Sequence, residues 1–157
     1  MVGMNTAAGD HLSVRVWNAQ TGVGPAVYSI VASAGTDNCP TGITSVSPIV
    51  SQQTQTFTIT GAGFGTQAAY SGDSSHMELA DNSRAWFAGN TGNLVGLAVS
   101  SWSDTQIVIT GLTGSYGSNG WCIGAGDQLS VKVWNAQTGA GPAVYSVVAT
   151  SGSGTCP

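Results

Sequence analysis

Short runs of alternating apolar and polar residues recur through most of this chain, and they restrict it to a β fold. Runs such as TFTITG (56–61), QIVIT (106–110) and QLSVKVWN (128–135) place apolar side chains at every second position, the period of a half-buried strand. Gly, Asn, Asp, Ser and Pro separate the runs, and helical periodicity is nearly absent. Strands are predicted at 43–48, 56–61, 75–80, 84–88, 94–100, 106–110, 128–135 and 142–150. This pattern predicts an all-β, two-sheet antiparallel β-sandwich.

One piece of the chain occurs twice. Residues 9–32 and 126–149 are identical at 20 of 24 positions, and the differences are mild. The second copy forms the last two strands of the predicted sandwich. The first copy is therefore the same hairpin without the strands on which it would pack, and a lone hairpin is at best marginally stable in water.

Two explanations account for the duplication. Residues 9–32 are either the remnant of a preceding tandem domain, docked or partly ordered, or a hairpin that adds to or exchanges into a sandwich of the same or a neighbouring chain. Cys122 aligns with Asn5, so the first copy lacks a cysteine that would tie it down, and this favours the remnant. We therefore predict a duplicated hairpin over 1–38 and a β-sandwich module over 39–157.

Composition argues against several classes of partner. Only 6% of the residues are charged, and three basic residues against seven acidic ones give a net charge of −4. The chain thus offers no basic surface for a phosphate backbone or an anionic membrane. No apolar run approaches the ~20 residues of a membrane span, and no signal peptide is recognisable. We expect no nucleic-acid and no membrane partner, and a leader outside this chain if the natural protein is exported.

The three cysteines are Cys39, Cys122 and Cys156. A chain poor in Lys and rich in Ser, Thr and Gly, with cysteines just outside its predicted strands, fits an oxidising, extracellular compartment; the alternative is three unpaired thiols in the cytosol. Strands 128–135 and 142–150 are expected to be antiparallel neighbours, so the segments that flank them emerge at the same end. This predicts a Cys122–Cys156 disulfide, with Cys39 as the free thiol or the one that joins chains.

Several motifs bear a family resemblance. ITSVSP, TFTITGAGFG and SWSDTQIVITG, followed by a terminal hairpin, resemble the immunoglobulin-like IPT/TIG domains of secreted bacterial proteins over residues 43–150. The resemblance implies an immunoglobulin-like sandwich. The chain departs from it in the long aromatic insertion YSGDSSHMELADNSRAWFAGNTGN. With YGSNGWCIGAGDQLSVKVWNAQTG, that insertion resembles the carbohydrate-binding modules attached to bacterial glycoside hydrolases, which implies binding of cellulose or another β-glucan beside an endoglucanase.

The titratable residues do not suggest a catalytic site. Glu78 with Asp81 or Asp73 is the only local pair for a glycosidase acid and base, and most aspartates stand in turn sequences, where they cap the backbone. The same carboxylates with Asn82 would suit calcium, although turn capping is the more common role. Neither histidine belongs to a recognisable nucleophile motif. We expect no enzyme activity, no catalytic residue and no cofactor.

Alternation predicts which aromatic residues are exposed. Leu129, Val131 and Val133 are predicted to share the core face of strand 128–135, and Ala85 and Phe87 that of strand 84–88. The side chains left on the outer face of strands 75–80, 84–88 and 128–135 are His76, Glu78, Arg84, Trp86, Lys132 and Trp134.

These outward residues predict a sugar-binding surface. In the expected strand order 84–88, 75–80, 128–135 and 142–150, Trp86 and Trp134 lie two strands apart, about 10 Å, which is close to a cellobiose repeat. Polar side chains between and beside the two indoles would recognise ring hydroxyls, and Trp121 would flank the site. The alternative is that neighbouring loops cover both indoles. Trp102 is assigned to the edge of the core.

The sequence therefore predicts a secreted, non-catalytic carbohydrate-binding module. Its partner would be a β-glucan polysaccharide or cello-oligosaccharide, and its role would be to hold a linked glycoside hydrolase on its substrate during polysaccharide degradation. The alternative function is a structural TIG-like spacer or adhesin repeat of an exported protein. Both functions fit the same fold, so only a binding site distinguishes them.

Overall fold

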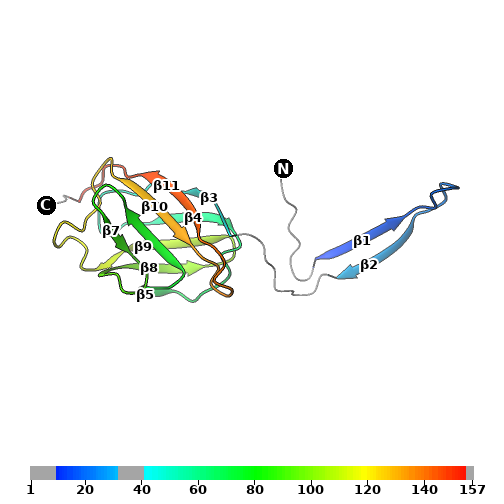
Figure 1. Ribbon diagram of the computed structural model, residues 1–157, viewed down its shortest axis with the longest axis horizontal. Coiled ribbons are helices and arrows are strands. Elements are labelled where there is room, and N and C mark those ends of the chain that lie inside the picture. Colours follow the sequence, from blue (N-terminus) through cyan, green and yellow to red (C-terminus); the bar gives the residue numbers. More distant parts are fainter. Residues whose placement is uncertain (1–9, 32–40, 155–157) are drawn as a thin grey trace. The chain divides into compact units, whose positions relative to one another are not determined.

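The computed structural model describes residues 10–31 and 41–154, and the chain divides into two compact units, residues 1–39 and 40–157. In the first unit the described residues form an antiparallel hairpin, β1 (His11–Val16) with β2 (Ala26–Val31). In the second unit the described residues form nine strands, which are drawn in Figure 1. No helix occurs among the described residues, and therefore none there could span a membrane. The all-β prediction is confirmed.

The strands of the second unit match the predicted ones closely. They are β3 (Gly42–Val46), β4 (Phe57–Ala62), β5 (Tyr70–Gly72), β6 (Met77–Asp81), β7 (Trp86–Ala88), β8 (Val95–Trp102), β9 (Gln106–Gly114), β10 (Gln128–Val133) and β11 (Ala143–Val148). Each predicted strand has a counterpart, whereas the three-residue β5 was not predicted. β9 also extends past its predicted end at residue 110.

The nine strands form a sandwich that nearly closes into a barrel. The hydrogen-bonded order is β11-β10-β6-β7-β8-β9-β4-β3, with β5 paired to β8. In Figure 1 the layer that contains β7, β10 and β11 crosses in front of the layer that contains β4, β8 and β9. The predicted order of the front layer is confirmed. The strands of this unit pair antiparallel to one another, except that β7 and β8 are parallel. An isolated parallel bridge between Val50 and Thr150 joins the segment that follows β3 to the segment that follows β11.

Apolar side chains from both layers fill the core. Phe57, Ile59, Ile107 and Ile109 of the back layer are fully buried, as expected for alternate residues of β4 and β9. The front layer contributes Met77, Leu79, Leu129, Val131 and Val133, each at most 1% exposed. The predicted core face of β6 and β10 is thus confirmed.

The predicted faces of β7 are inverted. Trp86 is 4% exposed and Phe87 is 49% exposed. The turn before β7 explains the inversion, because Ala85 has a φ of 55° and the register places Trp86 opposite Asp81. Asp81 shares the inner face of β6 with Leu79, and cross-strand partners lie on the same face, so Trp86 also points inward.

Candidate functional site

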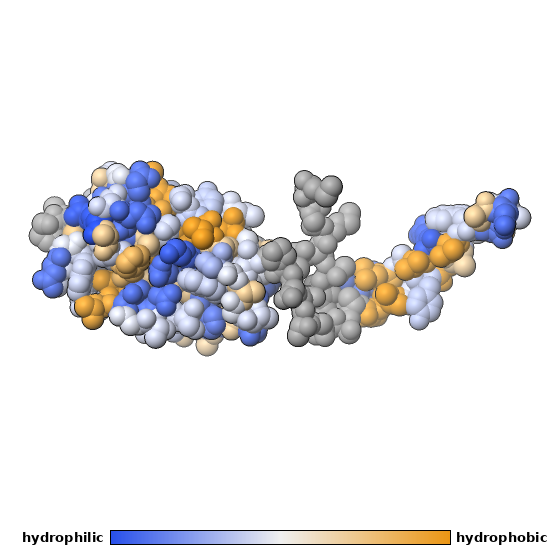
Figure 2. All heavy atoms as spheres, viewed as in Figure 1, coloured by the Kyte–Doolittle hydropathy of each residue, from blue (hydrophilic) through white to orange (hydrophobic). Residues whose placement is uncertain are grey.

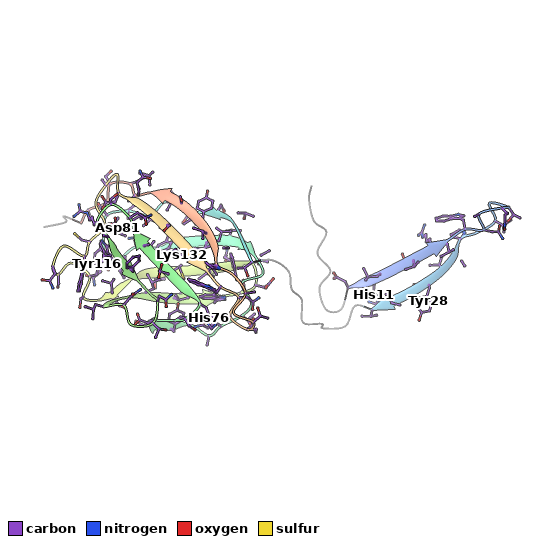
Figure 3. The ribbon with its side chains drawn as sticks, in the orientation of Figure 1. His11, Tyr28, His76, Asp81, Tyr116 and Lys132 are labelled. Carbon is purple, nitrogen blue, oxygen red and sulfur yellow. The ribbon has the colours of Figure 1, made fainter. Side chains whose placement is uncertain are left out.

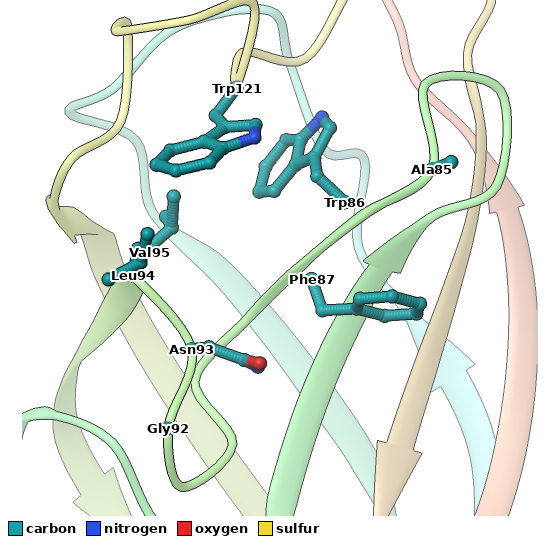
Figure 4. Close-up of a pocket in the computed structure, with 8 residues that line it drawn as sticks. All are labelled: Ala85, Trp86, Phe87, Gly92, Asn93, Leu94, Val95 and Trp121. Atoms are coloured by element: carbon teal, nitrogen blue, oxygen red, sulfur yellow. The ribbon is translucent and has the colours of Figure 1, made fainter.

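A pocket of about 230 Å³ lies at one end of β7, between the loop that follows this strand and the loop at residues 115–122. Its lining residues are Ala85, Trp86, Phe87, Gly92, Asn93, Leu94, Val95 and Trp121. We call it the tryptophan pocket. Figure 4 shows the indoles of Trp121 and Trp86 close together, with Leu94 and Val95 beside Trp121. The pocket brings together two of the predicted site residues, Trp86 and Trp121.

Local packing fixes Trp86. The indole packs edge-on against the phenol of Tyr116, with ring centroids 6.0 Å apart and an interplanar angle of 69°. Such an edge-to-face arrangement is a preferred geometry for aromatic pairs. The Tyr116 hydroxyl accepts a hydrogen bond from Ile123 N at 3.1 Å, which ties the ring to the end of its loop. Trp86 is consequently a rigid wall of the pocket.

The 115–122 loop positions the second indole. Trp121 N donates to Ser118 O at 2.9 Å, and Trp121 O accepts from Gly117 N at 2.8 Å, so the backbone of Trp121 is held within its own loop. Ser115 N donates to Leu94 O at 2.9 Å and joins this loop to the opposite rim of the pocket. Trp121 itself is half-buried. It therefore offers a partly exposed aromatic surface on a defined backbone.

The β7–β8 loop supplies the polar group of the pocket. Gly89 N donates to Val95 O at 2.9 Å and closes the loop, and Asn93 N donates to Asn90 O at 3.0 Å inside it. Figure 4 shows the Asn93 side chain next to Gly92 and on the side of Phe87, while the indole of Trp86 lies farther away, next to Trp121. Asn93 Nδ2 and Trp86 Nε1 are buried without a hydrogen-bond partner. Buried donors are normally paired, and an unpaired one costs about 1–3 kcal/mol.

The lining of the tryptophan pocket is mostly apolar. Apart from the Asn93 amide and the indole N–H groups, the side chains that line the pocket are apolar, and none of them titrates. Phe87 and Leu94 are 49% and 63% exposed and form an apolar rim. A small pocket with aromatic walls and few polar groups suits a ligand that presents both C–H surfaces and hydrogen-bond acceptors.

Four other predicted site residues lie together on the outer face of the front layer. His76, Glu78, Lys132 and Trp134 are all half-buried, and we call their surface the outer face. Lys132 and Glu78 are cross-strand partners, and Lys132 Nζ lies 2.7 Å from Glu78 Oε1. Trp134 N donates to His76 O at 2.8 Å. Figure 3 shows His76 and Lys132 on this layer.

The two-indole platform predicted for this face is wrong. Trp86 points to the opposite side of β7, so it is not the second indole that was predicted beside Trp134. The exposed aromatic residue of β7 is Phe87. The structure thus separates the predicted site into the outer face and the tryptophan pocket.

Arg84 belongs to neither group. Its Nε lies 2.7 Å from Asp127 Oδ2, which also accepts a hydrogen bond from Gly124 N at 2.6 Å. Burial raises the pKa of Asp127, but the hydrogen bonds from Gly124 N and Arg84 outweigh burial and lower it overall. Arg84 therefore connects the β6–β7 turn to the loop before β10. It is a structural residue.

Asp81 caps the turn that reorients β7. Its Oδ1 accepts hydrogen bonds from Ser83 N and Arg84 N, each at 3.0 Å. Burial, and then the charge of Asp127, raise the pKa of Asp81. Asp81 and Glu78 point to opposite faces of β6, so these two side chains do not form a carboxylate pair or share a calcium ion. Within residues 10–31 and 41–154, no three His, Cys, Asp or Glu side chains gather as metal ligands do.

Sequence reasoning missed Asn93, Leu94 and Phe87 as pocket residues. Asn93 stands in a loop without periodicity, Leu94 was predicted to begin strand 94–100, and Phe87 was assigned to the core. Trp102, in contrast, is 6% exposed and donates from Nε1 to Phe64 O at 3.1 Å, which confirms its assignment to the core. The Gly and Asn cluster GNTGN (89–93) marks a loop, but it does not indicate which side chain turns inward.

Comparisons with known proteins return no match to a family model, a curated protein or a solved structure. The likeness to IPT/TIG domains and to carbohydrate-binding modules rests on the sequence motifs alone.

Proposed function

We propose that this protein is a non-catalytic carbohydrate-binding module that recognises a β-glucan chain and places one of its pyranose rings in the tryptophan pocket. The observation that carries the proposal is the combination of two indoles with the unpartnered Asn93 amide in one open pocket. The partner would be cellulose, a cello-oligosaccharide or a related plant glucan.

Pyranose rings present both an apolar surface and hydrogen-bond acceptors, which are the two features that the pocket lining suits. Their axial C–H groups form apolar faces that pack on an indole, and their hydroxyl oxygens accept hydrogen bonds. Trp121 would supply the stacking surface, with Trp86 behind it, and Asn93 Nδ2 would donate to a hydroxyl. Drug-sized ligands occupy pockets of about 300–1,000 Å³, so a pocket of about 230 Å³ suits a single ring.

The absence of titratable side chains from the pocket lining supports binding without hydrolysis. A glycosidase needs two carboxyl groups that flank the scissile bond. The role proposed for the module is to keep a linked glycoside hydrolase on its polysaccharide outside the cell. The duplicated hairpin, which is typical of tandem arrays, favours the second candidate function, a structural repeat of an exported protein.

Native gels that contain soluble β-glucans test the proposal. Wild-type protein should be retarded, and Trp121→Ala should lose the retardation while it still unfolds cooperatively, because Trp121 is only half-buried. Trp134→Ala is the matched control, since it removes a half-buried indole from the outer face. If wild-type protein runs unretarded on all glucans, the glucan-binding proposal is wrong and the structural repeat is the candidate function that remains.

Asn93→Asp separates hydrogen bonding from stacking. The substitution keeps the size of the side chain but replaces the amide donor with a carboxylate that accepts, so glucan affinity should fall. If Asn93→Asp binds as wild type does, the amide does not contact the sugar.

A further inference from the structure

The two copies of the duplicated segment form the same hairpin. The six residue pairs between β1 and β2 correspond position by position to the six pairs between β10 and β11, with Val14 in the place of Val131. The turns also correspond. Asn18 Oδ1 accepts hydrogen bonds from two backbone amides at 2.9 Å, and Asn135 Oδ1 does so in the second copy.

In the second unit this hairpin fills a defined position. β10 pairs with β6, and Leu129, Val131 and Val133 are at most 1% exposed. Beyond the strand, Asn135 Nδ2 donates to Gly63 O at 2.9 Å. Gln137 hydrogen-bonds the backbone of Thr66, which accepts from Gln137 Nε2. We call the edge of β6 together with Gly63 and Thr66 the hairpin slot.

The first hairpin exposes the side chains that the second one buries. Val14 and Val16 are 52% and 60% exposed, although their counterparts Val131 and Val133 are fully buried. Figure 2 shows apolar residues along this hairpin. Asn18 and Gln20 are also exposed, and they correspond to the residues that contact Gly63 and Thr66. The first hairpin thus carries a recognition surface for the slot.

The four differences between the copies preserve that surface. Arg15 replaces Lys132, so a cation remains available for Glu78. The other replacements are His11 for Gln128, Val23 for Ala140 and Ile30 for Val147, and each of these three positions is exposed or half-buried in the second unit. No replacement falls on a fully buried position.

We propose that the hairpin slot accepts either hairpin, so that β1–β2 can replace β10–β11 beside β6 of its own chain. The chain is long enough for this exchange. In the exchanged state Val31 would take the place of Val148. Thr41 Oγ1 donates a hydrogen bond to Ala140 O at 3.1 Å, and Ala140 lies eight residues before Val148 in the chain. Eight strand residues cover about 27 Å, whereas the ten steps from Val31 to Thr41 reach up to about 33 Å.

The full-length chain with Val131→Asp tests the exchange, because a charge at this fully buried position disables β10–β11 in the slot. The variant should still unfold cooperatively and remain a monomer in native mass spectrometry. Val14→Asp alone should melt as wild type does. Val14→Asp with Val131→Asp should show no cooperative transition, since both hairpins are then disabled.

Disulfide trapping identifies the hairpin in the slot. Lys132 pairs with Glu78, so Arg15→Cys with Glu78→Cys in the Val131→Asp background should form a bond within one chain, which peptide mapping detects. The proposal is overturned if Val131→Asp unfolds as completely as the double variant. It is equally overturned if the bond joins two chains, or if a folded variant forms no such bond.

Discussion

The inverted face of β7 leads to a stability prediction for two adjacent aromatic residues. Trp86→Ala should destabilise the second unit strongly, because Trp86 is 4% exposed, whereas Phe87→Ala should cost little, because Phe87 is 49% exposed. Truncation of a buried Trp to Ala costs about 3–5 kcal/mol. The lower end of this range applies here, because the pocket already leaves empty space beside the Trp86 ring and because Trp86 Nε1 has no hydrogen bond to lose. The edge-to-face contact with Tyr116 accounts for about 0.5–1.5 kcal/mol of this.

Phe87→Ala should cost about 1 kcal/mol, since roughly half of the apolar surface of the side chain is already in water. For a unit of this size each kcal/mol lowers the melting temperature by about 3–5 °C. Trp86→Ala is therefore expected to melt about 10–15 °C below wild type, and Phe87→Ala no more than about 5 °C below it. Urea unfolding followed by circular dichroism gives the two free energies. A larger loss for Phe87→Ala than for Trp86→Ala would refute the observed register and restore the outward indole.

Three further predictions concern other parts of the chain. Cys122 should be bonded to Cys156, which lies outside the described residues, and the disulfide should add about 3 kcal/mol to the free energy of unfolding. Gly154, two residues before Cys156, lines the same hollow as Cys122. Thiol labelling of Cys122 in the denatured, non-reduced protein would exclude the disulfide. Asp81→Asn should stabilise the protein at pH 7 and not at pH 3. The pKa of Asp81 is raised in the folded state, so the stabilising contribution of this carboxyl group is complete below the unfolded pKa of 3.8 and is lost as pH rises through the folded pKa. Melting curves recorded at both pH values would contradict this if Asp81→Asn melted no higher than wild type at pH 7. Deletion of residues 1–38 should leave a folded module whose glucan affinity changes by less than tenfold, or 1.4 kcal/mol. Calorimetric titration and melting curves of the full-length and truncated proteins test this, and an unfolded truncated protein would contradict it.

Strand periodicity predicted correctly which faces of β6 and β10 point into the core, because only one face of each strand carries large apolar residues. In β10, Leu129, Val131 and Val133 alternate with polar residues, and Met77 and Leu79 do so in β6. In β7 the periodicity left two choices, since Trp86 and Phe87 are both large aromatic residues. The turn at Ala85 settled the choice, and its left-handed φ is not evident from the residue type, since alanine rarely adopts it.

The tryptophan pocket was beyond prediction for a related reason. Two of its walls come from the loops at 89–94 and 115–122, which have no periodicity and meet only in the folded chain. The sequence identified Trp86 and Trp121 as unusual aromatic residues, but their association depends on the inward face of β7. The short β5 also escaped prediction, because Tyr70–Gly72 is too short to alternate and includes a glycine.

Isothermal titration of the full-length protein with one cello-oligosaccharide tests most directly whether the tryptophan pocket binds glucan. Wild-type protein should bind one oligosaccharide per chain. Trp121→Ala should lose about 1–3 kcal/mol, by analogy with bases stacked on aromatic side chains, which is roughly a 5- to 150-fold loss of affinity. Trp134→Ala should bind nearly as wild type does. Full binding by Trp121→Ala together with loss of binding by Trp134→Ala would contradict the account and move the site to the outer face.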